Sequence, residues 1–206
     1  ERLLIVFYEY KSYEVVPASG YAEFPIVDYC YNSFSDDEKA KLRNDWEIVR
    51  DYLQQIYHQY PDKQSRNAQL EGFTHLLRPS LLLIELVPGF KRKASGSYQK
   101  PRYRLKQTFV DYIVKGHFDK SRVKNEIKLK ESFSGFVELD AHCHALSLKY
   151  SGKTLAQLRE MLGIEANVKD IASKCVIRMF GTDCNRLNQI SDFTKAGIIA
   201  KTITVT

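Results

Sequence analysis

The chain has 206 residues, of which 44% are hydrophobic and 27% are charged, and its formal net charge at pH 7 is +6. This length and apolar content suffice for a hydrophobic core, which excludes a disordered protein, and the positive charge favours polyanionic partners. The sequence has no apolar run long enough to span a bilayer and no signal-peptide pattern. We therefore expect a soluble, cytoplasmic protein without a membrane partner.

The first third of the chain predicts two strand regions and one long helix. Residues 3–7 form an apolar run typical of a buried strand, and residues 15–31 predict a second strand region with a turn at Ser19 and Gly20. Ser35 and Glu38 form a capping box, after which apolar residues recur at helical spacing up to Pro61. This stripe, which we interpret as core rather than as a binding groove, consists of Leu42, Trp46, Val49, Leu53 and Ile56.

The next segments have less regular patterns. Residues 62–69 are polar and predict a linker, whereas residues 75–86 are rich in Leu and Ile and predict one or two buried strands interrupted at Arg78 and Pro79. An arginine in so apolar a setting is either part of a structural salt bridge or a residue that faces DNA. The sequence leaves both roles open for Arg78.

Residues 88–109 form a basic stretch that suggests a nucleic-acid partner. Gly and Pro residues predict a loop as far as Pro101, followed by a short strand and a helix over residues 108–115. A basic loop that ends at a helix start offers both cations and free backbone N–H groups to phosphates. Ordinary solvated surface is the alternative. The stretch contains no acidic residue, and its cations are Lys91, Arg92, Lys93, Lys100, Arg102, Arg104 and Lys106.

The second half of the chain predicts mainly helices. Residues 116–130 are highly charged, with little apolar periodicity, and indicate a linker between domains. A helix is expected over residues 133–148, another over residues 170–180, and a strand over residues 198–205 after Gly197. Thr154 and Gln157 form a second capping box, which starts a short helix that Gly163 ends.

Two groups of potential ligands do not predict a metal site or a nucleophile. Asp140, His142, Cys143 and His144 are adjacent on a predicted helix, which would point them to different faces, and no second ligand cluster has zinc-like spacing. The four cysteines lack any CxxC pair and are expected to be reduced thiols.

A third group resembles part of a metal-dependent nuclease motif. Such enzymes place an Asp before a strand that carries an acidic residue and, two positions later, a Lys on the same face. Asp192 and Lys201 have this arrangement, but Ile199 occupies the acidic position. The motif is therefore degenerate, because one carboxylate and an isoleucine cannot hold a divalent cation.

Several motifs together resemble the family of the MutH mismatch-repair endonuclease and the Sau-type restriction enzymes that cut GATC. Residues 7–10 (FYEY), 42–47 (LRNDWE), 78–79 (RP) and 103–106 (YRLK) are similar to the second half of that nuclease domain. Residues 154–158 (TLAQL), 175–181 and 192–205 are similar to its first half. Ile177 also stands where the family has a glutamate that supports the metal site.

The resemblance implies a mixed α/β, restriction-endonuclease-like fold with a central mixed sheet flanked by helices. Residues 1–118 would be the C-terminal half of one MutH-like domain, residues 119–130 a charged linker, and residues 131–206 the N-terminal half of a second, catalytically degenerate domain. On this interpretation the chain is a fragment with residues missing at both ends. Packing of the two halves into one permuted unit is left open.

The function implied is that of a Mg-dependent type II restriction endonuclease, which binds double-stranded DNA and hydrolyses a phosphodiester at a specific site, GATC by resemblance. Asp192 and Lys201 match catalytic positions, and Asp192 is the one matched metal ligand. Expected DNA contacts are Arg78, Lys91, Arg92, Lys93, Arg102, Arg104, Lys106, Gln107 and Thr108. A non-catalytic DNA-binding or allosteric module and a protein-interaction domain are the alternatives. Self-association and DNA looping are also left open.

Overall fold

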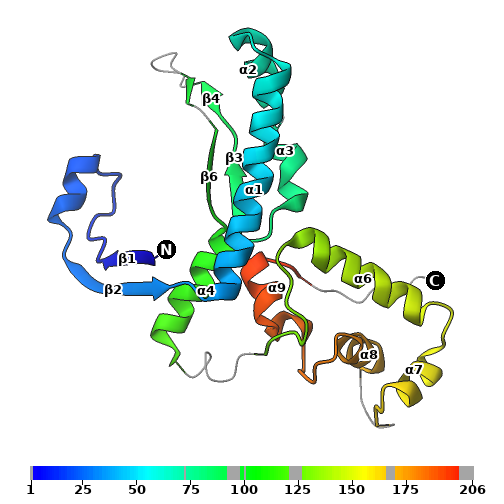
Figure 1. Cartoon of the computed structure of the whole chain (residues 1–206). Helices are drawn as coiled ribbons and strands as arrows, with labels where there is room; N and C mark the ends of the chain where they lie inside the picture. Colours follow the sequence, from blue (N-terminus) through cyan, green and yellow to red (C-terminus); the bar gives the residue numbers. More distant parts are fainter. Residues whose placement is uncertain are drawn as a thin grey trace.

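The structure is a computed structural model that describes residues 2–71, 73–91, 98–99, 101–120, 127–165 and 170–199 (Figure 1). The chain is mixed α/β, and its described strands pair into three two-stranded antiparallel sheets, β1–β2, β3–β6 and β4–β5. The described residues do not form the central mixed sheet that the resemblance implies. In chain order the elements are β1 (Arg2–Tyr8), η1 (Ala18–Glu23), β2 (Ile26–Ser33), α1 (Asp36–Gln59), α2 (Lys63–Glu71), α3 (Phe73–Leu77), η2 (Arg78–Ser80), β3 (Ile84–Val87), β4 (Phe90–Lys91), β5 (Tyr98–Gln99), β6 (Arg102–Leu105), α4 (Gln107–Phe118), α6 (Phe136–Tyr150), α7 (Leu155–Met161), α8 (Ile171–Met179), η3 (Leu187–Gln189) and α9 (Ser191–Ala196).

The first hairpin confirms the predicted N-terminal strand but not its burial, because Leu4 and Val6 are exposed. Its two strands pair with Leu3 opposite Asn32 and Ile5 opposite Cys30, so that alternate residues of β1 face the core. The second strand is shorter than predicted, because residues 18–23 form a 3-10 helix and the strand begins only at Ile26.

Helix α1 confirms the capping-box prediction in detail. The Ser35 hydroxyl accepts a hydrogen bond from the Glu38 backbone N–H, and the Glu38 carboxylate accepts one from the Ser35 N–H. Leu42 and Val49 are buried as expected, but Trp46 remains 44% exposed. Part of the stripe that we interpreted as core therefore lies at the surface.

Two predictions after α1 are wrong. The expected linker over residues 62–69 is helix α2, whose first turn is capped by the Asp62 carboxylate through the Ser65 N–H. The expected strand over residues 75–86 is instead helix α3, a 3-10 turn and a strand over residues 84–87 only. Dense Leu content alone does not distinguish a buried helix from a strand.

The β3–β6 hairpin and α4 confirm the predicted strand-to-helix transition after Pro101. Ile84 pairs with Leu105, and the Lys106 N–H then donates to the Leu83 carbonyl just before α4 begins. In Figure 1 the hairpin runs beside α1 and continues into β4. Phe109 of α4 is completely buried.

Three predicted helices in the second half are confirmed as α6, α7 and α8. The Thr154–Gln157 capping box is present at α7, and Gly163 follows that helix in the left-handed region with φ 62°. Helix α9, over residues 191–196, was not predicted. Of the strand expected over residues 198–205, Ile198 and Ile199 have no regular structure, and residues 200–206 lie outside the described part of the chain.

One hydrophobic core includes residues from both predicted half-domains. Phe34, Leu42 and Phe109 of the first half belong to the same buried cluster as Phe133 and Phe193 of the second half. The described residues of the predicted linker also contact this core: Leu129 is buried, and the Ile127 carbonyl accepts a hydrogen bond from the Ser191 N–H. Helices α1, α4 and α9 meet where the two halves join (Figure 1).

Candidate nucleic-acid interface

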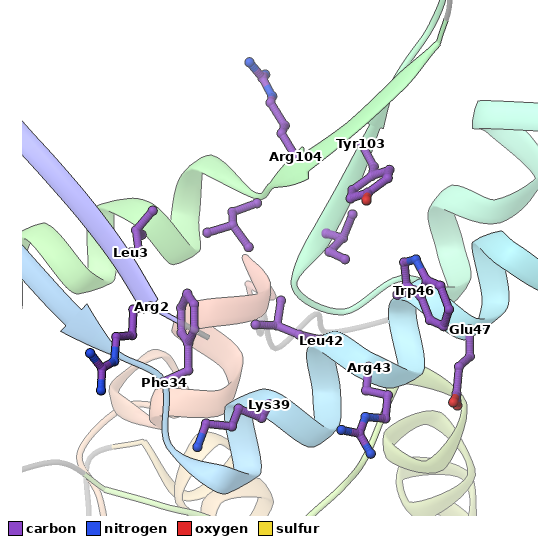
Figure 2. A pocket seen from close by; sticks show the side chains of 12 residues that line it. Arg2, Leu3, Phe34, Lys39, Leu42, Arg43, Trp46, Glu47, Tyr103 and Arg104 are labelled. Atoms are coloured by element: carbon purple, nitrogen blue, oxygen red, sulfur yellow. The ribbon is translucent and has the colours of Figure 1, made fainter.

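A groove of about 980 Å³ lies between β1, α1 and the β3–β6 hairpin (Figure 2). Its floor is apolar, because the hairpin register and the α1 stripe direct aliphatic and aromatic side chains into it. Phe34, Leu42 and Ile84 are nearly completely buried beneath it. The full floor consists of Leu3, Phe34, Leu42, Ile84 and Leu105.

The described lining of the groove is cationic. Among the described residues it contains Arg2, Lys39, Arg43 and Arg104, and one carboxylate, Glu47. Arg50 lies 4.0 Å from Glu47 and offsets part of that negative charge. The groove therefore presents an excess of positive charge to solvent.

The four cations differ in how firmly they are held. Arg104 pairs with Glu85 at 2.6 Å, and Lys39 pairs with Asp36 at 2.9 Å. Arg43 is exposed and forms no ion pair or hydrogen bond with any residue in the described ranges. Arg43 is therefore more available to an anionic ligand than Arg104 or Lys39.

Two large aromatic side chains lie at one end of the groove. Trp46 of α1 is 44% exposed and Tyr103 of β6 is 57% exposed, and Figure 2 shows both at the same end. The guanidinium of Arg50 lies 4.8 Å from the centre of the Trp46 ring, which restrains the indole. Both aromatic residues also line an adjoining hollow of about 430 Å³ further along α1.

The basic stretch predicted from the sequence is only partly described. Three of its cations lie outside the described residues, namely Arg92, Lys93 and Lys100. Lys91 is described only as a backbone position of β4. Arg102 is exposed on β6, and Arg78 is exposed in η2. Among the predicted DNA contacts whose side chains are described, Arg104 alone lines the groove.

Three predicted DNA contacts form bonds within the protein. The Lys106 Nζ donates to the carbonyls of Leu81 at 2.9 Å and Ala196 at 3.3 Å, and burial lowers the pKa of this lysine despite the attraction of Asp45. The Thr108 hydroxyl donates to the Lys195 carbonyl, and Gln107 donates to Asp111. These bonds of Lys106 and Thr108 join α9 to the start of α4.

Asp192, the residue matched to a metal ligand, is bonded to a lysine. Its Oδ1 lies 2.5 Å from the Nζ of Lys41, whose side chain is 3% exposed. The same ammonium contacts Asp37 Oδ2 at 2.5 Å. Burial alone would lower the pKa of Lys41, but these two carboxylates outweigh it and raise the pKa above its usual value of 10.5. An ammonium that is charged at neutral pH thus lies between the two acids.

This arrangement does not fit a magnesium site. The described residues contain no group of three or more potential metal ligands, and Ile199 offers no oxygen. Ile177, at the other position matched to a supporting acid, is 1% exposed and packs in the core. Lys201 lies outside the described residues. The cation between Asp37 and Asp192 is the protein's own lysine.

Of the potential ligands at residues 140–144, His142 has an acidic partner and Cys143 is partly buried. His142 Nδ1 lies 2.8 Å from Glu131, and burial raises the pKa of the Cys143 thiol. All four cysteines are free. These contacts give no sign of a metal site around residues 140–144.

The sequence contains a signal for the groove that our interpretation missed. Lys39, Arg43 and Trp46 follow one another at spacings of four and three residues, which places them on one face of α1. Because we interpreted Trp46 as a core residue, we did not group it with Lys39 and Arg43. The contribution of Arg2 could not have been found, because it depends on where the first hairpin packs.

Comparisons with known proteins leave the family of the chain open. No family model, no curated protein and no solved structure matched it. No helix in the described ranges has the length and apolar character needed to cross a membrane.

Proposed function

We propose that this chain is a DNA-binding part of a Mg-dependent, site-specific deoxyribonuclease of the MutH-like type, and that the part itself does not cleave DNA. The proposal combines the motif order in the sequence with the charge of the groove. The observation that carries it is the cluster of Arg2, Lys39, Arg43 and Arg104 around one groove with a single carboxylate. Phosphate oxygens are the natural partners of such a cluster.

The absence of cleavage follows from Asp192. Metal-assisted phosphodiester hydrolysis requires carboxylates that are free to bind the ion. The contact with Lys41 occupies Asp192, and Ile199 supplies no second carboxylate. The catalytic set of the proposed nuclease therefore belongs to another part of the protein.

A protein-interaction domain is the second candidate, and one observation favours it. The outward face of the β1–β2 hairpin is apolar although it is exposed, with Leu4 at 59% and Tyr29 at 63%. Exposed apolar patches often mark protein contacts. The residues of this face are Leu4, Val6, Tyr8, Tyr29 and Tyr31.

A paired gel-shift and cleavage assay separates these functions. Labelled duplexes with and without GATC are incubated with the chain at low salt, in Mg²⁺ and then in EDTA. We expect a shift in both conditions and no cleavage. Arg43→Glu should weaken the shift, whereas Lys153→Glu, the same charge change at an exposed turn away from the groove, should not. Cleavage would overturn the assignment of Asp192, and absence of any shift would favour the protein-interaction function.

A further inference from the structure

The groove has two features that contacts with duplex phosphates do not require. Its floor is lined by apolar side chains, and Trp46 and Tyr103 expose their rings at one end. In a duplex the faces of the bases are stacked and inaccessible, so neither feature would find a partner there. Both features match the surface of an unstacked base.

We propose that this groove binds single-stranded DNA, with one unstacked base lying against Trp46 and Tyr103 and with the adjacent phosphates held by Arg43 and Lys39. The inference rests on the proposed function and adds a second ligand form, an unpaired strand, that the same groove takes besides duplex DNA. Grooves that bind single strands combine a positively charged path for the backbone with aromatic side chains for the bases.

The order of the basic and aromatic side chains along α1 suits a DNA strand that runs parallel to this helix. Lys39, Arg43 and Trp46 lie on one helix face, with about 5–6 Å between side-chain origins at successive positions. Beyond this face, Trp46 and Tyr103 line both the main groove and the adjoining hollow. The aromatic pair lies at the end of the main groove where the adjoining hollow begins, so a DNA strand that occupies both would pass the pair at its middle.

Charge and rigidity also favour this ligand. Arg43 has no partner among the described residues, so binding a phosphate breaks no existing ion pair. Arg50 restrains the Trp46 ring by its cation–π contact while 44% of the tryptophan stays exposed. A stacking surface that is fixed in advance loses little side-chain entropy when a base binds.

Trp46 is the only tryptophan in the chain, so its fluorescence reports directly on the groove. The test titrates the chain with a short oligothymidylate at low salt and, separately, with a blunt hairpin duplex. We expect the single strand to quench Trp46. Fluorescence anisotropy of a labelled oligothymidylate should show that Trp46→Ala weakens binding roughly ten- to a hundredfold, the usual effect of removing one stacking partner. Trp46→Phe should retain most of the affinity, and Lys153→Glu should match the wild type.

The outcomes separate this inference from the proposed function. Duplex binding without single-strand binding would overturn the inference and leave the proposed function intact. Single-strand binding that neither quenches Trp46 nor responds to Trp46→Ala would place the ligand elsewhere and also overturn it. Failure to bind either nucleic acid would overturn both. A thermal melt of each variant shows whether a loss of binding reflects loss of the fold.

Discussion

Lys41 of α1 and Asp192 of α9 form a largely buried ion pair across 151 residues of sequence, with 2.5 Å between Nζ and Oδ1. A second pair, Lys195 with Glu38 at 2.9 Å, joins the same two helices. The two pairs run in opposite directions, since each helix supplies one lysine and one acid. The junction between the two halves of the chain is thus an ionic contact beside an apolar core.

Lys41→Met should destabilise the chain by about 3 kcal/mol, because removal of one partner leaves buried charge uncompensated. Urea unfolding at neutral pH measures the change. Lys39→Met is the matched control on the same helix, where the exposed pair with Asp36 should contribute little to the unfolding free energy. Equal losses in the two variants would show that the junction does not depend on Lys41.

The effect of Lys41→Met should depend on pH. Burial alone would raise the pKa of Asp37, but hydrogen bonds from Lys41 and Ser132 outweigh it and hold the pKa below 3.8. The stabilisation from Asp37 is therefore complete above pH 3.8 and is lost as the pH falls through the folded-state pKa. The Lys41 contribution is complete below pH 10.5 and is lost as the pH rises through its raised pKa.

Urea unfolding of wild type and Lys41→Met at about pH 3, about pH 5 and about pH 8 tests this dependence. The difference in unfolding free energy between wild type and Lys41→Met should be the same at the two higher pH values and smaller at the lowest pH. A difference that grows on acidification would contradict the assignment of Asp37 as an ionised partner.

Asp45 should be intolerant of substitution. Its carboxylate is fully buried and accepts hydrogen bonds from the backbone N–H groups of Leu82, Leu83 and Ile84 at 2.7–2.9 Å. The amide introduced by Asp45→Asn would point an N–H₂ group at some of these donors, so the substitution should cost about 2–4 kcal/mol.

Urea unfolding and hydrogen exchange at the Leu83 amide measure this cost. Asp51→Asn is the control, since Asp51 is 61% exposed and pairs only with Arg50 in the described part of the chain. Because Asp45 fixes the chain that leads into β3, its loss should also disturb Ile84 in the floor of the groove. A native-like melt for Asp45→Asn would contradict this account.

Divalent metal should not stabilise the chain. A site occupied at a hundred times its dissociation constant would add about 2.7 kcal/mol to the unfolding free energy. The Lys41 ammonium already pairs with both Asp37 and Asp192 where a metal ion would have to bind, so the melting temperature should be the same in Mg²⁺ and in EDTA. A clear rise with Mg²⁺ would show that a metal site exists despite this contact.

Local signals in the sequence predicted much of the secondary structure. Both capping boxes, at Ser35 and Thr154, mark the starts of helices, because they satisfy backbone N–H groups that every helix leaves unpaired. The wrong secondary-structure predictions have two causes. The polar residues of α2 lack an apolar period, and the Leu-rich residues 75–83 fit more than one structure.

The site was less predictable than the helices. Arg104, an expected DNA contact, lines the groove, but Lys106 and Thr108 bond to carbonyls of α9, which are about 90 residues away in sequence. No local pattern reports such a contact. Asp192 was identified as chemically notable, whereas its partner Lys41 was not, because the sequence does not show which helices pack together.

The salt dependence of DNA affinity tests the central claim most directly, since the claim is that groove cations bind phosphates. For four phosphate contacts with duplex DNA, log K should fall with log salt at a slope of about −3.6, so that affinity falls roughly a hundredfold between about 50 and 200 mM salt. Arg43→Ala should reduce the magnitude of the slope by about 1. An affinity that does not change with salt, or a slope that Arg43→Ala leaves unchanged, would contradict the assignment of this groove as the DNA-binding surface.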